Sequence, residues 1–385
     1  MEGRGGNEAA PAIRERTTAM STLDFEITLT DRPASAEERA AVLADPGFGR
    51  HFTDHMITIR YSADRGWYDA RLEPYGPIPM DPASQVFHYA QELFEGLKAY
   101  RQPDGSIVTF RPYMNAARMN RSAKRMAMPG IPEELFVRAC ELLVGTDREW
   151  VPDAEGHSLY LRPFMFATTR ALGVNSPANE FLFMVIASPS GLYYPRGIKP
   201  VTVWLSQEYT RAAPGGTGEA KFGGNYAASF AGQAEAVAHG CDQVVWLDAV
   251  EHRWVEEVGS MNLMFVYGSG SDARLLTPAL TGTLLPGVTR DSMLKLAPDL
   301  GIPAEEGKIS IEEWQEGCES GAITEVFGCG TAAIISPVGR VKGADREWAI
   351  GTGEPGEISM RLRQELVGIQ YGTRPDPYGW VHRIV

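Results

Sequence analysis

The sequence predicts a two-domain fold of the α/β class (α+β within each domain), in which short strands and helices are interspersed. Three observations lead to this prediction. The chain of 385 residues is long enough for two hydrophobic cores. Segments of alternating apolar residues, typical of strands, are mixed with longer segments of helical periodicity. The stretch 191–200 contains two prolines and two glycines and is the best linker candidate. We therefore expect domains over 22–190 and 201–385.

The first domain is expected to contain a hairpin and two helices. Gln102-Pro103-Asp104-Gly105 is a strong turn motif that joins two strands. Pro112 and Pro132 each stand where proline is tolerated in a first helical turn, so each is expected to open a helix. The expected strands are 56–61, 96–100, 106–111, 159–168 and 181–187, and the expected helices are 112 to about 126 and 132 to about 143.

The second domain is expected to alternate strands and helices after the linker. The expected elements are a strand 201–205, a helix 225 to about 238, a hairpin over 243–250 and 253–257, a strand 262–267, a helix from about 288, a strand 334–337 and a final helix near 357–370. Residues 1–21 have almost no large apolar side chains and lack the apolar core of a signal peptide. We expect a disordered extension there, or a start at Met20.

Composition excludes several function classes. The net charge of -13 argues against nucleic acid or an anionic membrane as a partner, because both need a basic surface. No apolar run reaches the length of a membrane span, so we expect a soluble, cytoplasmic protein. The cysteines are far apart, and none forms a Cys-x-x-Cys pair that would indicate zinc or redox chemistry. His51 and His55 have a helical metal-ligand spacing, but 57–61 alternates like a strand, so no metal is expected.

The chemistry-bearing segment is Gly218-Glu219-Ala220-Lys221-Phe222-Gly223-Gly224-Asn225-Tyr226. A lysine amine can hold an aldehyde cofactor covalently, and the surrounding glycines let the backbone approach a bulky ligand. A phosphate-binding loop is the competing interpretation, but it requires Ser or Thr directly after the lysine, where this chain has Phe222. A solvated loop lysine is the other alternative, and the neighbouring motifs decide against it.

The run 221–226, taken with Glu257-Val258-Gly259-Ser260-Met261-Asn262, resembles the fold-type IV pyridoxal-phosphate enzymes. Within them it is most similar to the branched-chain aminotransferases. Further matching segments occur in the same order at 52–56, 93–98, 159–163 and 330–333. The resemblance implies a homodimer of chains that each have a smaller N-terminal and a larger C-terminal domain. It places pyridoxal 5'-phosphate in the cleft between these two domains.

The resemblance also assigns the cofactor-binding residues. Lys221 would bind the cofactor and move the proton between Cα and the cofactor. Tyr226 would contact the phenolic oxygen, although it could also simply begin a packed helix. Glu257 would keep the ring nitrogen protonated, while Glu256, on the opposite strand face, is expected in solvent. The phosphate would be held by Arg118, Thr331 and the amides of Val288 and Thr289, where 286–289 should open a helix. Arg121 and Arg125 are expected in solvent or in ion pairs.

An apolar substrate pocket is implied by the same resemblance. Ser260 and the Ala332 amide would hold the α-carboxylate, and Arg162 would meet the distal carboxylate of glutamate. The family's threonine at position 260 is serine here, which removes one methyl group. Some members of the family carry a redox-sensing cysteine pair, but the matching positions here are Ala333 and Ser336, so that regulation is expected to be absent. The candidate walls are aromatic: Phe48, Tyr89, Phe94, Tyr160 and Tyr193.

The expected activity is amino-group transfer from a branched-chain amino acid to 2-oxoglutarate, with ping-pong kinetics. A D-amino-acid aminotransferase and an aminodeoxychorismate lyase share the fold and are the nearest alternatives. A non-catalytic pyridoxal-phosphate-binding protein is a third alternative. It would not need Lys221, Tyr226 and Glu257 together, because binding alone does not require a tuned ring nitrogen.

Overall fold

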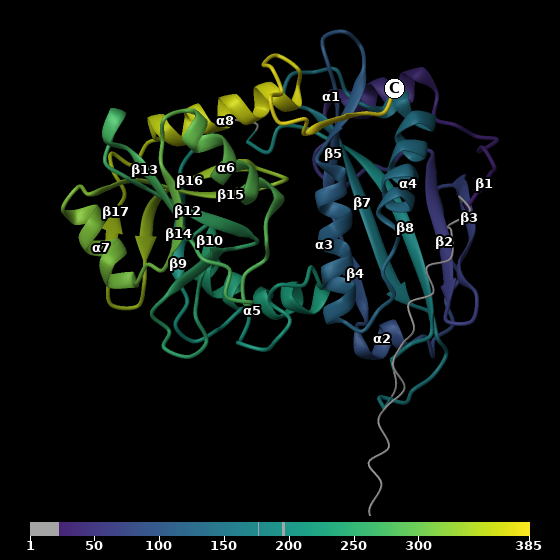
Figure 1. Cartoon of the computed structure of the whole chain (residues 1–385), viewed down its shortest axis with the longest axis horizontal. Coiled ribbons are helices and arrows are strands. Elements are labelled where there is room, and N and C mark those ends of the chain that lie inside the picture. The colour runs from purple at the N-terminus through teal and green to yellow at the C-terminus, as the bar shows by residue number, and fades with distance from the viewer. Residues whose placement is uncertain (1–22, 176, 195–196) are drawn as a thin grey trace, which may run out of the picture.

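The computed structural model describes residues 23–175, 177–194 and 197–385, so the extension expected at 1–21 lies outside the described residues. Among the described residues, two nine-stranded sheets make up the two halves of the molecule (Figure 1). The predicted α/β class is confirmed. No helix in the described ranges combines the length and the apolar character that crossing a membrane would require.

The first sheet has the strand order β1-β3-β2-β8-β7-β5-β6-β18, and β4 pairs with β7. Adjacent strands of this sheet are antiparallel, except for β1 and β3, which run parallel. The hairpin expected around 102–105 joins β5 and β6. The strands are β1 (Phe25–Ile27), β2 (His55–Ser62), β3 (Gly66–Pro74), β4 (Glu92–Phe94), β5 (Leu97–Arg101), β6 (Ile107–Phe110), β7 (Ser158–Ala167) and β8 (Glu180–Ser190).

Helices α3 (Pro112–Arg125) and α4 (Glu133–Thr146) lie against one face of this sheet, in front of it in Figure 1. The buried residues of α3 recur every three or four positions, which places one stripe of the helix against the sheet. Phe136 and Leu143 of α4 share the resulting core with Phe183 of β8. Two shorter helices, α1 (Ala36–Ala44) and α2 (Gln85–Tyr89), complete this half.

The second sheet has the order β11-β10-β9-β16-β15-β12-β13-β14, with β17 added to β16. Because β11 also pairs with β12, the strands from β9 to β12 close with β15 and β16 into a ring, which leaves these strands no free edge. The strands are β9 (Val201–Leu205), β10 (Gln243–Leu247), β11 (Val255–Val258), β12 (Met261–Tyr267), β13 (Arg274–Pro278), β14 (Ala304–Gly307), β15 (Ile323–Gly330), β16 (Ile334–Lys342) and β17 (Glu347–Ala349).

Helices surround this ring and connect the two halves. α5 (Gly223–Ala238) follows the loop that carries Lys221, which we call the lysine loop. α6 (Val288–Asp299) begins beside the ring of strands. The other two helices, α7 (Ile311–Glu319) and α8 (Glu357–Gln370), pack on the outside of this ring. Leu362 and Leu366 of α8 share one core with Phe327 of β15 and with Tyr100 and Val108 of the first sheet. One apolar cluster therefore joins the two halves.

The last strand returns to the first half of the molecule. β18 (Val381–Arg383) pairs antiparallel with β6, as Val381 opposite Phe110, and the chain crosses visibly to that side in Figure 1. It covers the edge that β6 would otherwise expose. These residues fall inside the range 201–385 that we expected to form the second domain, yet their strand belongs to the first sheet.

Candidate active site

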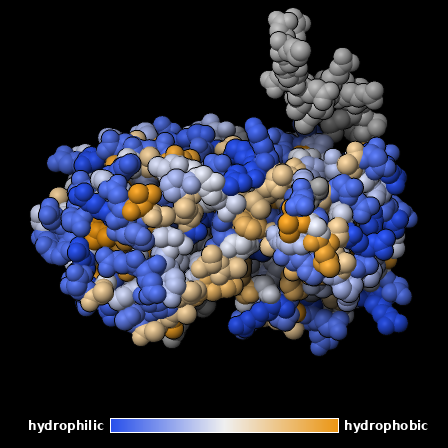
Figure 2. Space-filling model, turned by 90° about the horizontal axis from the view of Figure 1, so that it is seen from below, coloured by the Kyte–Doolittle hydropathy of each residue, from blue (hydrophilic) through white to orange (hydrophobic). Residues whose placement is uncertain are grey.

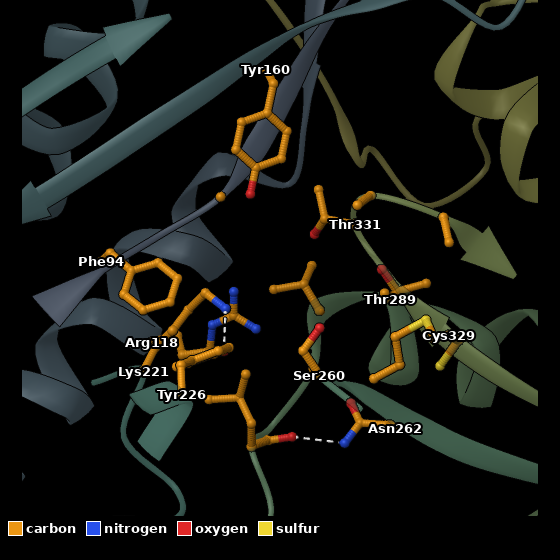
Figure 3. Close-up of a pocket in the computed structure, with 18 of the residues that line it drawn as sticks. Phe94, Arg118, Tyr160, Lys221, Tyr226, Ser260, Asn262, Thr289, Cys329 and Thr331 are labelled. Atoms are coloured by element: carbon orange, nitrogen blue, oxygen red, sulfur yellow. Dashed lines mark hydrogen bonds between the residues drawn. The ribbon is translucent and has the colours of Figure 1, made fainter. Parts of the chain in front are cut away.

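A cavity of about 210 Å³ lies between the two halves, and we call it the central cavity. Residues from both sheets line it, together with the lysine loop and the first turn of α6 (Figure 3). It brings together most of the side chains that the sequence singled out: Phe48, Phe94, Arg118, Tyr160, Arg162, Tyr193, Lys221, Tyr226, Ser260, Val288, Thr289, Thr331 and Ala332.

Lys221 is held in the cavity by its backbone and by its amine. Its N–H donates to the Ser122 hydroxyl at 2.9 Å, and its carbonyl accepts from the Phe94 N–H at 3.1 Å. Its Nζ lies 2.9 Å from the Tyr226 hydroxyl, the contact dashed in Figure 3, and 4.6 Å from the centroid of the Phe94 ring. The Tyr226 hydroxyl and the Phe94 ring therefore position the Lys221 amine in the central cavity.

The loop after the lysine is fixed by Glu92 on β4. The Gly223 N–H at the start of α5 donates to the Glu92 carboxylate. Burial raises the pKa of Glu92, while this hydrogen bond and the charge of Arg162 oppose the shift. A β-carbon at Gly223 would clash with Glu92 Oε1, so only glycine permits this close approach.

Glu257 is buried just behind the cavity rather than in its lining. Its carboxylate forms an ion pair with Arg211 at 2.9 Å, and it accepts from the Asn262 side chain at 2.9 Å and the Leu285 N–H at 3.0 Å. Burial raises the pKa of Glu257, and the Arg211 charge opposes this. Arg211 and the two hydrogen-bond donors favour the ionised form and so work against the net rise in pKa, and they hold the carboxylate next to Asn262, which does line the cavity.

The expectation that Glu256 is solvated is wrong. Glu256 is only 7% exposed, and it accepts a hydrogen bond from the Thr283 hydroxyl. The two glutamates do point to opposite sides of β11, as alternation requires. The side opposite to Glu257 is covered by the segment that carries Thr283, and burial there raises the pKa of Glu256.

Arg118 enters the cavity from α3 as one partner of a buried ion pair. Its Nε and Nη2 donate to the two carboxylate oxygens of Glu95 at 2.8 and 2.7 Å, and Glu95 is fully buried. Asn115 donates to the same carboxylate at 2.8 Å. Burial raises the pKa of Glu95, but Arg118, Lys221 and Asn115 outweigh it, and the net pKa is lowered. This bidentate pair fixes the orientation of the guanidinium that faces the cavity.

The first turn of α6 presents backbone donors to the cavity. Gly287 caps the helix without a side-chain hydrogen bond, and Val288 and Thr289 follow it in the lining. The first N–H groups of a helix have no partner within it and attract anions. A β-carbon at Gly287 would clash with the Asn262 side-chain oxygen, so the glycine keeps this corner open. Thr331 adds a hydroxyl to the lining of the same cavity (Figure 3).

The part of the central cavity around Tyr160, at the top of Figure 3, is lined by aromatic rings and by the guanidinium of Arg162, and we call it the upper cavity. Phe48 and Tyr160 meet edge to face, with ring centroids 5.0 Å apart. The Arg162 guanidinium lies over the Phe94 ring at 4.8 Å, and its Nη2 is 3.4 Å from the Tyr160 hydroxyl. Its Nε is buried with no hydrogen-bond partner in the described ranges. Arg162 thus offers an unpaired donor in apolar surroundings.

Tyr89 is the predicted wall residue that the structure does not bring to the central cavity. It ends α2, is 40% exposed, and donates its hydroxyl to the Leu172 carbonyl. Glu95, Asn262 and Arg211 are among the residues of the site that had no predicted role. Glu95 and Asn262 stand inside the matched motifs, so a signal existed for them. Arg211 had no such signal, because its pairing with Glu257 is a tertiary contact.

The residues present fit a phosphorylated aldehyde cofactor. A directed lysine amine, a buried carboxylate behind Asn262, and an uncapped helix start beside an arginine are the three groups that such a molecule needs. No cluster of potential metal ligands occurs in the described part of the chain.

Comparison with known proteins identifies the family of this chain. A family model described as amino-transferase class IV matches residues 92–341. A branched-chain-amino-acid aminotransferase of Mycolicibacterium smegmatis is 58% identical over 94% of this chain and 98% of its own length. One from Mycobacterium tuberculosis is 56% identical over 94% of this chain and 99% of its own length.

Solved structures give the same family. The branched-chain amino acid aminotransferase of Escherichia coli superposes with a TM-score of 0.70 at 28% identity, over 85% of this chain and 99% of that one. A second branched-chain amino acid aminotransferase, solved with pyridoxamine 5'-phosphate, gives a TM-score of 0.69 at 28% identity, over 85% of this chain and 98% of that one. The chain therefore belongs to the class IV aminotransferase family.

Proposed function

We propose that this protein is a branched-chain amino acid aminotransferase that uses pyridoxal 5'-phosphate. It would transfer the amino group of L-leucine, L-isoleucine or L-valine to 2-oxoglutarate, giving L-glutamate and the branched 2-oxo acid. The observation that carries the proposal is the Lys221 amine, 2.9 Å from the Tyr226 hydroxyl at the base of an aromatic cavity. The names of the relatives support the choice of substrate class.

Each residue has a task in this reaction. When bound, the cofactor supplies a carbonyl for the substrate amine and a ring that accepts electrons from Cα. Lys221 would hold the cofactor at rest and, once released, would take the proton from Cα and deliver it to the cofactor. Tyr226 would orient the lysine amine, and the Glu257 carboxylate, fixed by Arg211, would favour a protonated ring nitrogen.

Phosphate binding would fall to the first turn of α6 and its neighbours. The free amides of Val288 and Thr289, the Thr331 hydroxyl and Arg118 converge on this part of the cavity. Arg118 would act as an oriented donor more than as a free charge, because Glu95 already neutralises it.

The upper cavity suits two kinds of side chain. Phe48, Phe94 and Tyr160 offer an apolar surface to a branched aliphatic group. Arg162 offers the unpaired Nε to the distal carboxylate of glutamate. Ser260 and the Ala332 amide would hold the α-carboxylate common to all substrates.

A homodimer is the proposed assembly. Figure 2 shows an apolar patch on the N-terminal half near α2, and exposed apolar side chains gather there: Phe87, Tyr89, Leu172 and Val174. The segment that carries Leu172 lies against α2, since the Ala171 N–H donates to the Ala83 carbonyl at 3.1 Å. Exposed patches of this kind often mark interfaces. Tyr89, absent from the cavity of its own chain, would then reach the cavity of the second subunit.

Two further properties belong to the proposal. A cytoplasmic location is supported by four cysteines that are all free. A role in amino-acid biosynthesis is supported only by the substrate class.

Initial rates measured over a grid of leucine and 2-oxoglutarate concentrations test the reaction. Parallel double-reciprocal lines with glutamate as product are expected for a ping-pong transferase. Turnover of D-alanine, or release of pyruvate from aminodeoxychorismate, with no turnover of leucine would instead favour the other activities of this fold.

A further inference from the structure

A second cavity lies behind the substrate-binding turn, and we call it the rear cavity. It measures about 220 Å³ and shares Tyr193, Ala332 and Ala333 with the central cavity. Its remaining walls come from β5, from described residues of 191–198 and from α8. The turn 331–334 therefore separates two cavities, and the mechanism proposed above uses only one of them.

Two cations line the rear cavity without an acidic partner. Lys98 on β5 is only 8% exposed, and its Nζ donates to the Ala332 carbonyl at 2.9 Å. Arg363 on α8 is half-buried and forms no ion pair with any described residue, and its Nε is buried without a hydrogen-bond partner there. Burial and the Arg363 charge lower the pKa of Lys98 to about 8. The buried Lys98 ammonium and the half-buried Arg363 guanidinium face one cavity without a described carboxylate, so an anion placed between them would stabilise both charges.

The other residues that line the rear cavity indicate which further groups a ligand would need. Leu192, Ile334 and Val367 give the cavity an apolar surface. Gln370 is only 4% exposed, and its Oε1 is buried without a donor in the described part of the chain. A buried amide oxygen of this kind accepts a hydrogen bond when a donor is supplied.

We propose that the rear cavity is a second binding site, for a small carboxylate that has an apolar body and one hydroxyl or amino donor. Its carboxylate lies between Lys98 and Arg363, and its donor meets Gln370 Oε1. A guanidinium and an ammonium that face one cavity are well suited to a carboxylate. Inorganic phosphate would leave the apolar wall of Leu192, Ile334 and Val367 without a partner.

A ligand in the rear cavity affects substrate binding in the central cavity through the turn 331–334, which lines both cavities. Ile334 has φ of 64°, a conformation that strains a β-branched residue, and the Ile335 N–H donates to the Ala333 carbonyl at 2.8 Å. The Ala332 carbonyl is held by Lys98. A carboxylate that draws the Lys98 ammonium away removes one support of a strained turn, which weakens substrate binding at the Ala332 amide. This last step rests on the proposed function, whereas binding itself does not.

Equilibrium dialysis of the holoenzyme with radiolabelled 2-hydroxyisovalerate tests the site directly. Because the central cavity can also take this acid, the decisive quantity is the difference between variants. Arg363→Gln is expected to lose one bound molecule per chain, or to bind it at least tenfold more weakly. Arg361→Gln, at an exposed position of the same helix, is expected to match the wild type. Equal binding by all three proteins would overturn the proposal.

Two competition experiments define the ligand class. Isovalerate, which lacks the hydroxyl, is expected to bind the Arg363-dependent site about two- to tenfold more weakly, the effect of one neutral hydrogen bond. Inorganic phosphate is expected not to displace the acid at equal concentration. Displacement by phosphate would contradict the assignment to a carboxylate with an apolar body.

Kinetics test the connection between the cavities. In the wild type, 2-hydroxyisovalerate is expected to leave a part of the inhibition that saturating leucine does not relieve. Arg363→Gln should keep only the competitive part. The same inhibition pattern in both proteins would show that occupation of the rear cavity does not reach the turn. A failure of leucine turnover would concern the proposed function, and the dialysis result would stand apart from it.

Discussion

The Nζ of Lys221 lies 2.9 Å from the Tyr226 hydroxyl, and both groups face the Phe94 ring, whose centroid is 4.6 Å from the amine and 4.9 Å from the centroid of the Tyr226 ring. The lysine side chain is flexible by nature, so this arrangement is what directs its amine. Tyr226 is well placed at the start of α5 for this task, because the helix fixes its backbone.

Tyr226→Phe removes the hydroxyl that contacts the lysine amine. We expect the half-reaction with leucine to slow by about 10- to 100-fold, the range for losing a hydrogen bond to a charged group. Stopped-flow absorbance of the cofactor measures this step. Tyr113→Phe, at an exposed tyrosine of α3, is the matched control and should leave the rate unchanged. Equal rates for both variants would remove Tyr226 from the mechanism.

Glu257→Gln tests the buried carboxylate. The neutral amide cannot favour a protonated ring nitrogen, so the half-reaction rate should fall by about 100-fold or more. The neighbouring variant Glu256→Gln changes a carboxylate that contacts Thr283 instead, and it should retain most of the activity. Single-turnover rates at saturating cofactor compare the two variants. A larger loss of rate in Glu256→Gln than in Glu257→Gln would show that Glu256, and not Glu257, supports the reaction.

Glu95→Gln breaks the buried pair with Arg118. Because the guanidinium is then left buried without a counter-charge, we expect a loss of about 3–5 kcal/mol in the free energy of unfolding. Urea denaturation of the cofactor-free protein measures it. Glu37→Gln, on the exposed surface of α1, is the control. A loss below about 1 kcal/mol would mean that the pair is not important for stability.

The same pair predicts a pH dependence with a definite sign. The folded-state pKa of Glu95 is lowered, so its contribution is fully present above the unfolded pKa of about 4.3. It is lost as the pH falls through the folded-state value. The difference in unfolding free energy between wild type and Glu95→Gln should therefore shrink below about pH 4 and stay constant near neutrality. A difference that grows on acidification would contradict the lowered pKa.

Ser260→Thr restores the methyl group that the family carries at this position. A smaller space next to Cα should disfavour side chains that branch at Cβ, so kcat/KM for valine and isoleucine should fall relative to leucine, by up to about tenfold. Ser260→Ala separates the loss of the hydroxyl from the effect of size. Unchanged ratios among the three amino acids would show that this residue does not shape the pocket.

Sequence reasoning found the residues that stand in continuous motifs. Lys221 and Tyr226 stand five residues apart in one motif, and the resemblance that this motif carries implied their roles. Arg211 could not be found in this way, because the charge that it neutralises, Glu257, becomes its neighbour only when β11 is in place. The solvated position expected for Glu256 was wrong for a similar reason, since the covering segment around Thr283 is distant in sequence.

The fold, too, has features that local sequence predicts and features that depend on contacts between distant segments. The hairpin of β5 and β6 and the start of α3 were predictable from turn residues and from a proline at the first helical position. The pairing of β18 with β6 was not, because no local pattern tells which sheet edge a terminal strand will cover. Tyr89 is a further case: its exposure in a single chain makes its predicted role depend on a second subunit.

The central claim is that Lys221 bears the cofactor and that leucine reacts with it. The most direct test is the absorbance spectrum of the purified protein before and after leucine is added without an oxo acid, followed by borohydride reduction and peptide mapping. We expect the yellow resting form to convert to the amine form of the cofactor, and reduction of the resting protein to place the cofactor on Lys221. A resting form that leucine leaves unchanged while a D-amino acid converts it, or a label on another lysine, would contradict the account.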